Sequence, residues 1–234
     1  KNDPATTLVP DLLLKSLSIT RSIISLLVDG YETEAFANWR TLHECECTLV
    51  VLEKYSNQII DTYLKHMRFG IAFKNGISDK EEQDRIFYSM KDEMRDLGLK
   101  SKDIKKYIEY GWLYSVPGVK EDESFKLNFR DGLEKVADLS RYAKIYEISS
   151  EIIHSTPILI YSNKEYYYFI TLLNTYESFF RLEHVFITLF SKHVSKEQMM
   201  QYNALRNVYY AQLVNIHDRE VNEFRRYQKD SKRK

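Results

Sequence analysis

The sequence predicts an all-α protein, a multi-helix bundle of about eight or nine helices with no sheet. Apolar residues recur at helical spacing along almost the whole chain, and no segment of any length alternates as a strand does. Only 7 Gly and 4 Pro occur among the 234 residues, so few positions favour tight turns. We therefore expect a single helical domain over residues 1–234, which is long enough to bury a sizeable core.

Capping and turn residues divide the chain into the expected helices. Pro10-Asp11 opens the first helix and Asp29-Gly30 ends it. Ser78 begins a sequence that resembles a capping box, and Ser195 caps the final helix. The expected helices cover about residues 10–28, 32–55, 57–74, 79–97, 101–110, 129–154, 164–193 and 195–227.

Two stretches fall outside this pattern. Residues 111–128 contain Pro117-Gly118 and an acidic cluster, which predicts an irregular loop. Residues 228–234 are basic and are expected to fray from the last helix.

Composition narrows the classes of function. The chain has 34 basic and 34 acidic residues, so a general polyanion-coating role has no support, although a local patch can still exist. The apolar stretch 8–28 is interrupted by Asp11, Lys15 and Arg21, which favours a core helix over a membrane span. Because no signal peptide is visible, we expect a cytoplasmic protein without a membrane association.

The cysteine pattern predicts no metal site and no cofactor. Cys45 and Cys47 lie two residues apart in an expected helix, so their side chains point to different sides and cannot easily bridge each other. A zinc site would need further ligands, and the sequence has no second cysteine pair. We interpret both as free thiols of a reducing compartment.

A first polar stripe lies in the otherwise apolar helix at 32–55. Arg40 and Glu44 are one turn apart there, and apolar residues occupy most of the remaining circumference. Charged groups beside a core need a partner or a purpose, because their desolvation costs free energy. Two interpretations stay open: an ion pair that fixes helix register, and a charge that faces a ligand.

A second polar stripe lies in the helix at 129–154. Tyr146, Ser150 and His154 follow one another at four-residue steps and border an isoleucine-rich face. An imidazole beside a hydroxyl and a carboxylate can transfer protons, and one at a helix C-terminus can also act only as a cap. Because buried polar groups seek one another, we expect Arg40 and Glu44 to cluster with this stripe.

These motifs together resemble a broad bacterial family of unknown function. Its pattern is a Gly, then a helix with Arg-x-x-x-Glu, then a Trp, then a helix with Tyr, Ser and His. The matching segments are Asp29-Gly30-Tyr31-Glu32, Trp39-Arg40-Thr41-Leu42-His43-Glu44, Tyr110-Gly111-Trp112 and Tyr146 to His154 with Ser149-Ser150. The resemblance covers about residues 10–190 and implies a bacterial, cytosolic, all-helical protein, without an activity to carry over.

The chain is more distantly similar to the HEPN helical domains of toxin and phage-defence systems. Many of those are metal-independent ribonucleases that use an Arg and a His four to six residues apart on one helix. No Arg precedes a His at that spacing here. The similarity therefore implies that Arg40 supplies the positive charge from a different helix than His154.

Three functions stay open from the sequence. The first is a HEPN-like ribonuclease with RNA as partner, in which His154 is the acid–base group, Arg40 stabilises phosphate, and Glu44, Ser150 and Tyr146 orient them. The second is a non-catalytic interaction module, and the third is a small-molecule sensor. The aromatic residues at 166–190 also predict a homo-oligomer formed through the C-terminal helices.

Overall fold

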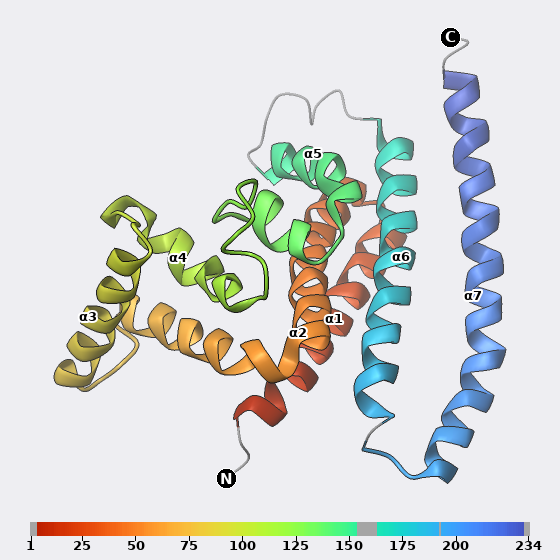
Figure 1. The fold of residues 1–234 in the computed structure, drawn as a ribbon. Helices are drawn as coiled ribbons and strands as arrows, with labels where there is room; N and C mark the ends of the chain where they lie inside the picture. The colour runs from red at the N-terminus through yellow and green to blue at the C-terminus, as the bar shows by residue number, and fades with distance from the viewer. Residues whose placement is uncertain (1–3, 154–162, 192, 232–234) are drawn as a thin grey trace. The chain divides into compact units, whose positions relative to one another are not determined.

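The computed structural model describes residues 4–153, 163–191 and 193–231, and these residues form helices and connecting turns with no strand (Figure 1). The all-α prediction is therefore confirmed. The α-helices are α1 (Pro4–Val28), α2 (Glu32–Phe73), α3 (Lys80–Asp96), α4 (Ile104–Tyr110), α5 (Ala143–Ile153), α6 (Lys164–Phe190) and α7 (Lys196–Ser231). Short 3-10 segments lie at Ser101–Asp103, Gly111–Ser115 and Ser140–Tyr142, and a π-helix lies at Phe129–Glu134.

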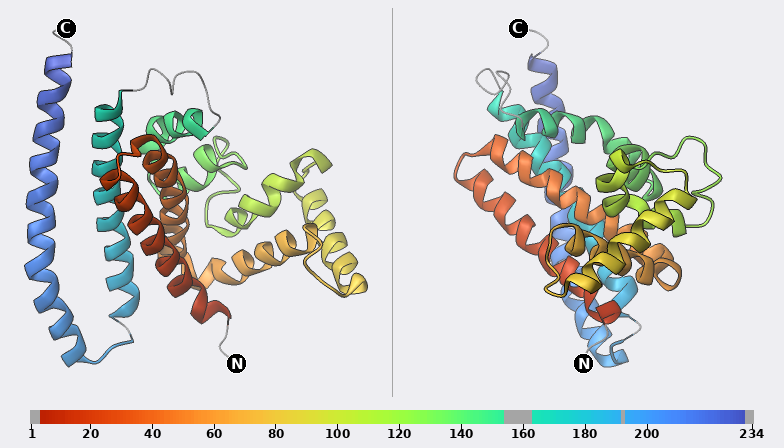
Figure 2. Two further views of the ribbon diagram at one scale, coloured as in Figure 1. Left: turned by 180° about the vertical axis from the view of Figure 1, so that it is seen from behind. Right: turned by 90° about the vertical axis from the view of Figure 1, so that its left-hand side faces the viewer.

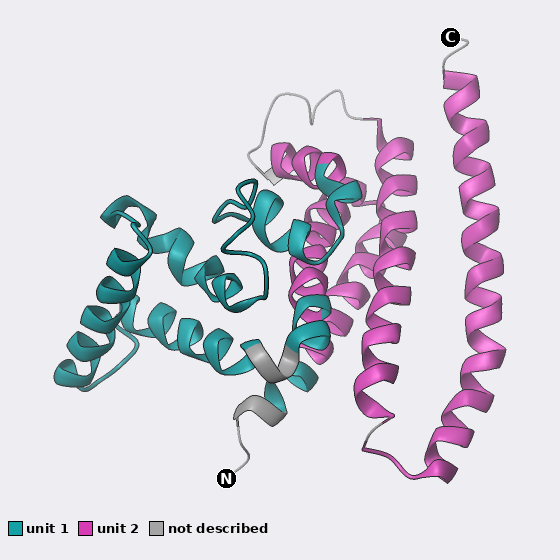
Figure 3. Ribbon diagram, in the orientation of Figure 1, with its two compact units in different colours: residues 1–11, 50–143 teal, residues 12–49, 144–234 magenta. Residues whose placement is uncertain are grey.

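Contacts group the chain into two compact units that are interleaved in sequence (Figure 3). Unit 1 contains residues 1–11 and 50–143, and unit 2 contains residues 12–49 and 144–234. Both stripes that the sequence singled out therefore lie in unit 2. That residues 1–234 fold as one domain stays a prediction.

The start and end of α1 differ in how well the sequence predicts them. The helix begins at Pro4 and passes through Pro10, which was expected to open it. Leu8 and Val9 are buried, and the free energy gained by burying their side chains offsets the cost of the backbone hydrogen bond that is lost at an internal proline. The end is as expected, because Gly30 has a φ of 78°, which favours glycine.

The helix α2 corrects a predicted break. Residues 32–55 and 57–74 were expected as separate helices, but the backbone is helical throughout Glu32–Phe73. The polar residues near position 57 cost less than 1 kcal/mol each in a helix. Leu52 and Ile59 are fully buried on either side of them, and this packing decides the local structure.

The helix predicted at 129–154 is instead broken. A π-helix covers Phe129–Glu134, and Asp138 adopts a φ of 60°, which no helix accommodates. The regular helix α5 begins only at Ala143. Of the predicted loop at 111–128, the first residues form the 3-10 segment Gly111–Ser115, and the remainder consists of turns.

A buried histidine organises the centre of unit 1. The Nδ1 atom of His66 donates to the Tyr107 carbonyl oxygen at 2.9 Å, and burial lowers the pKa of His66 to about 4. The Tyr107 hydroxyl donates to Glu93 at 3.0 Å. A Cβ atom at Gly111 would lie 2.5 Å from the rings of His66 and Tyr107, so this close packing requires glycine.

In unit 2, α6 and α7 are antiparallel and lie side by side (Figures 1 and 2). Ser195 caps α7 as predicted, with its Oγ atom accepting from the Gln198 amide at 3.2 Å. The helix continues to Ser231, so residues 228–231, expected to fray, are helical. Aromatic rings join the two helices over their whole length, at Phe186 and Tyr202, Phe180 and Tyr210, and Phe169 and Phe224.

This packing changes the interpretation of the aromatic residues at 166–190. They were expected to need a second copy of the chain, but α7 of the same chain contacts many of them. Homo-oligomer formation stays a prediction.

Candidate functional site

The N-terminal part of α2 carries polar side chains on two opposite faces. Arg40 and Glu44 are one turn apart, whereas Glu46 follows Glu44 by about 200° of helical rotation. Glu44 is 40% exposed at its side chain, and Glu46 is 0% exposed. Each carboxylate is the centre of its own set of hydrogen bonds.

The outward-facing set consists of Arg40, Glu44, Tyr146 and Ser150, and we call it the Arg40 cluster. The Arg40 Nε atom donates to Glu44 Oε1 at 3.2 Å, and its Nη1 atom donates to Ser150 Oγ at 2.9 Å. The Tyr146 hydroxyl donates to the same Glu44 oxygen at 2.5 Å. The Arg40 guanidinium also lies over the Tyr146 ring, with 4.5 Å between its central carbon and the ring centroid.

These contacts hold a cation close to the surface. The side chain of Arg40 is 24% exposed, although it is fixed from three sides. Burial alone would lower the pKa of Arg40, but Tyr146 and Glu44 together raise it above its ordinary value. Burial and the hydrogen bond to Glu44 raise the pKa of Tyr146, so the phenol stays protonated and donates to the carboxylate.

The predicted meeting of the two stripes is therefore confirmed for these residues. Arg40 and Glu44 from α2 contact Tyr146 and Ser150 from α5. His154, the fifth predicted member, lies outside the described residues. The catalytic roles assigned to all five side chains stay predictions.

The inward-facing set consists of His43, Glu46, Ser178 and Arg181, and we call it the Glu46 network. His43 Nδ1 donates to Glu46 Oε2 at 3.2 Å, and the Ser178 hydroxyl donates to the same oxygen at 2.8 Å. Arg181 Nε donates to the other carboxylate oxygen. His43, Glu46 and Ser178 are fully buried.

Charge compensation keeps this buried carboxylate ionised. Burial alone would raise the pKa of Glu46, but the hydrogen bond with His43 and the charge of Arg181 together lower it. A buried carboxylate without such partners would take up a proton instead. The Glu46 network therefore ties α2 to α6 through an ion pair inside unit 2.

Aromatic rings connect the two sets. The His43 ring stacks on Trp39 with 5.0 Å between centroids and lies 6.2 Å from the Tyr146 ring. Tyr146, a member of the Arg40 cluster, thus also contacts the Glu46 network through its ring.

The Glu46 network was not predicted from the sequence. Arg181 lies 135 residues from Glu46, and no local spacing links them. One signal was available: Glu46 stands between Cys45 and Cys47 in the most apolar part of the helix, where an acid needs a buried partner.

The described residues contain neither a grouping suited to a metal ion nor a helix suited to crossing a membrane. Within residues 4–153, 163–191 and 193–231, no three His, Cys, Asp or Glu side chains gather in a group that could hold a metal ion. Over the same part of the chain, no helix combines the length and the apolar character that crossing a membrane requires.

Comparison with known proteins places the chain in a family. Residues 8–166 match the model of the family of unknown function DUF5677, which is more than half of the chain. The chain belongs to DUF5677. Comparisons with curated proteins and with solved structures returned no match. The DUF5677 match includes every residue of the Arg40 cluster, whereas Ser178 and Arg181 of the Glu46 network lie beyond it.

Proposed function

We propose that this DUF5677 protein is a metal-independent ribonuclease and that the Arg40 cluster binds the phosphate at which RNA is cut. The observation that carries the proposal is the position of the Arg40 guanidinium, which is fixed by Glu44, Ser150 and the Tyr146 ring and is still 24% exposed. A planar guanidinium that is already oriented loses little freedom when it binds a phosphate.

The remaining donors of Arg40 suit a phosphate. A guanidinium has five N–H donors; the hydrogen bonds to Glu44 and Ser150 use two of them, and Tyr146 interacts with the group as well. Charge develops on the phosphate oxygens as RNA is cleaved, and an arginine at that point stabilises the transition state.

His154 is the proposed acid–base group. RNA can be cut when its 2′-hydroxyl oxygen bonds to the neighbouring phosphorus and the bond from phosphorus to the 5′-oxygen breaks. A base removes the proton of the 2′-hydroxyl, and an acid supplies a proton to the leaving oxygen. His154 follows Ser150 by one helical turn in sequence, which is the basis for assigning this role to it.

The other members of the cluster are positioning residues. Glu44 and Ser150 hold two edges of the guanidinium, and Tyr146 holds Glu44 through its hydroxyl. The basic segment from Arg225 onward would add affinity for the RNA backbone.

The test is cleavage of a labelled RNA in the presence of a chelator. Wild type should cut, His154→Ala should not, and Arg40→Lys should be strongly impaired, because an ammonium cannot form a two-pronged contact with phosphate. The rate should change with pH near neutrality, where an imidazole gains or loses its charge.

Arg206→Lys is the matched control for Arg40→Lys. Arg206 also contacts a carboxylate, Glu183, and lies over a tyrosine ring, that of Tyr210, at 4.2 Å. This variant should cut like wild type. Cleavage by His154→Ala at the wild-type rate, with both proteins equally folded by circular dichroism, would reject the ribonuclease.

A second candidate function is a module that binds a second copy of the chain. The described part of α7 contains no buried residue, and its apolar side chains Leu205, Val208 and Tyr209 are each more than half exposed. Apolar side chains so close together on one helix are typical of an interface.

Light scattering at tens of micromolar tests this candidate. Wild type should be dimeric, and Leu205→Asp with Val208→Asp should be monomeric. Asn207→Asp adds a charge to the same exposed stretch without removing an apolar side chain, so it should stay dimeric. A wild-type monomer at this concentration would reject the module.

A further inference from the structure

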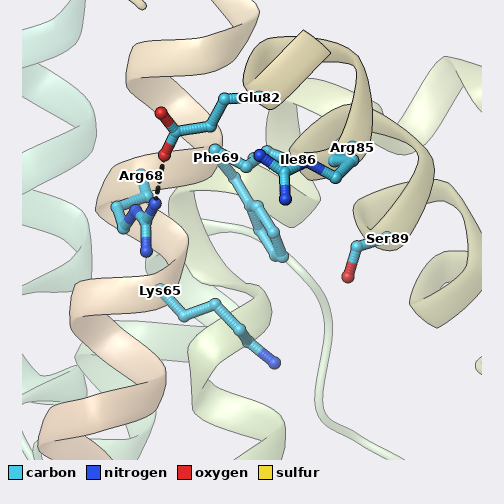
Figure 4. Close-up of a pocket in the computed structure, with 7 residues that line it drawn as sticks. All are labelled: Lys65, Arg68, Phe69, Glu82, Arg85, Ile86 and Ser89. Atoms are coloured by element: carbon cyan, nitrogen blue, oxygen red, sulfur yellow. Dashed lines mark hydrogen bonds and ion pairs between the residues drawn. The ribbon is translucent and has the colours of Figure 1, made fainter.

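Unit 1 contains a pocket between the C-terminal part of α2 and α3 (Figure 4). Its volume is about 340 Å³, which lies in the range of small-molecule sites. The residues that line it are Lys65, Arg68, Phe69, Glu82, Arg85, Ile86 and Ser89. All belong to unit 1, so the pocket is separate from the Arg40 cluster.

The lining has an excess of positive charge. Three cationic side chains line the pocket, and Glu82 is the one acid among the lining residues. Glu82 accepts from Arg68 at 2.8 Å, and Lys65 is bound to Glu93 at 2.8 Å. Arg85 forms no ion pair with any residue that the structure describes.

The geometry directs these cations toward one space. Figure 4 shows the ends of the Arg85 and Lys65 side chains directed into the pocket from opposite elements, with the ring of Phe69 between them. Arg68 lies at the same mouth, next to Glu82.

The floor of the pocket is apolar. Phe69 is only 3% exposed and belongs to a core cluster with Met90 and Tyr107, and Ile86 packs against that cluster. A ligand that enters would therefore meet cations at the sides and, below them, the partly exposed side chain of Ile86 with a small part of the Phe69 ring. Guanidinium groups bind phosphate strongly, and an aromatic floor suits a planar or apolar group.

We propose that this pocket binds a phosphate-bearing small molecule of mononucleotide size. Its phosphate contacts Arg85 and Lys65, and its non-ionic part packs against Ile86 beside Phe69. Glu82 opposes such a ligand, because a carboxylate near the phosphate repels it and also occupies Arg68. The proposal does not depend on the ribonuclease activity.

Titration calorimetry with AMP, inorganic phosphate and adenosine tests the proposal on the whole chain at low salt. AMP should bind more tightly than inorganic phosphate, because only AMP uses both the cations and the apolar floor. Adenosine, which has no charge, should not bind measurably at the same concentrations.

Three variants separate a built site from a general surface charge. Arg85→Gln should weaken AMP binding about tenfold, the effect of one charge-assisted hydrogen bond. Glu82→Gln should strengthen it severalfold. Arg95→Gln is the control: it removes the same charge from α3, where Arg95 is bound to Asp92 and does not line the pocket.

Unchanged AMP affinity in Arg95→Gln, together with opposite shifts in the other two variants, is the expected result. Equal weakening by Arg95→Gln and Arg85→Gln would overturn the proposal, since only net charge would then matter. No AMP binding at millimolar concentration would overturn it as well. Because every variant lies in unit 1 and binding is measured directly, failure here is distinguishable from failure of the ribonuclease.

Discussion

Glu44 and Glu46 are two residues apart on α2. The same kinds of donor bind the two carboxylates, but their exposure to solvent differs. Each accepts hydrogen bonds from an arginine and from a hydroxyl group, from Arg40 and Tyr146 in one case and from Arg181 and Ser178 in the other. Glu44 is 40% exposed and Glu46 is fully buried. The same type of contact therefore serves a surface site on one face and the interior of unit 2 on the other.

The difference in exposure determines how much each ion pair contributes to the free energy of unfolding. An ion pair that water reaches contributes at most about 1 kcal/mol to stability. Removal of one partner from a buried pair leaves an uncompensated charge in the interior and costs about 3–5 kcal/mol. Substitutions on the inward face should therefore mainly lower the stability of the protein. Substitutions on the outward face should mainly lower its proposed activity.

The largest expected effect is that of Glu46→Ala. It removes the buried carboxylate that accepts from Arg181 and Ser178, while Arg181 keeps its longer ion pair with Glu177 at 3.6 Å. The free energy of unfolding should therefore fall by about 3–5 kcal/mol. Glu44→Ala should lower it by about 1 kcal/mol or less. Urea denaturation followed by circular dichroism measures both, and equal losses would contradict the distinction between the two faces.

The next largest effect is expected from Arg181→Met, whose loss of stability relative to wild type should depend on pH. The pKa of Glu46 is lowered in the folded protein, so its contribution to stability is present above the ordinary value of 4.5 and is lost as the pH falls. Without Arg181 this contribution shrinks. The variant should be less stable than wild type by about 3 kcal/mol at neutral pH, the lower end of the range for a buried pair, and by less as the pH falls below 4.5.

Unfolding free energies of wild type and Arg181→Met across this pH range test the prediction. Arg206→Met removes an arginine from the partly exposed pair with Glu183 and serves as control. A difference between wild type and Arg181→Met that does not change with pH would show that Arg181 contributes packing and not charge.

A smaller effect is expected from the two serines. Ser178→Ala removes a donor from a fully buried carboxylate, which should cost about 1–2 kcal/mol. Ser150→Ala acts on Arg40, where water can replace the lost acceptor, and should cost about 0.5 kcal/mol. Thermal denaturation of both variants measures the two losses of stability. A larger loss in Ser150→Ala than in Ser178→Ala would contradict the distinction between the two faces.

An effect on stability as small as that of Ser150→Ala is expected from Tyr146→Phe. The ring stays over Arg40, and only the hydrogen bond to Glu44 is lost, so the cost should be about 0.5 kcal/mol. The same change should lower RNA cleavage, because Glu44 is then held less firmly against Arg40. Denaturation and cleavage measured on one preparation test both statements, and a large loss of stability with full activity would contradict them.

The sequence predicts the Arg40 cluster because its members repeat at one-turn spacing on two helices. Arg40 and Glu44 define one stripe, and Tyr146 and Ser150 define the other. Each stripe interrupts an apolar face, which indicates that they meet. Contacts of this kind can be predicted because the spacing of residues within each helix indicates them.

The Glu46 network cannot be predicted from local spacing. Its partners Ser178 and Arg181 come from α6, 132 and 135 residues away, and only the packing of α6 against α2 brings them to Glu46. The fold shows the same limit. Tertiary burial keeps α2 continuous where residue preferences suggest a break, and the left-handed Asp138 interrupts a helix that periodicity predicts.

In the proposed function, the outward face of α2 acts on RNA, whereas the inward face holds unit 2 together. A paired measurement on Arg40→Lys and Arg181→Lys tests this distinction most directly, with the RNA cleavage rate per folded molecule and the free energy of unfolding determined for each. Arg40→Lys should lose most of its cleavage and about 1 kcal/mol or less of its stability. Arg181→Lys should lose more stability and keep the wild-type rate. Full cleavage by Arg40→Lys, with a stability loss as large as that of Arg181→Lys, would contradict this distinction.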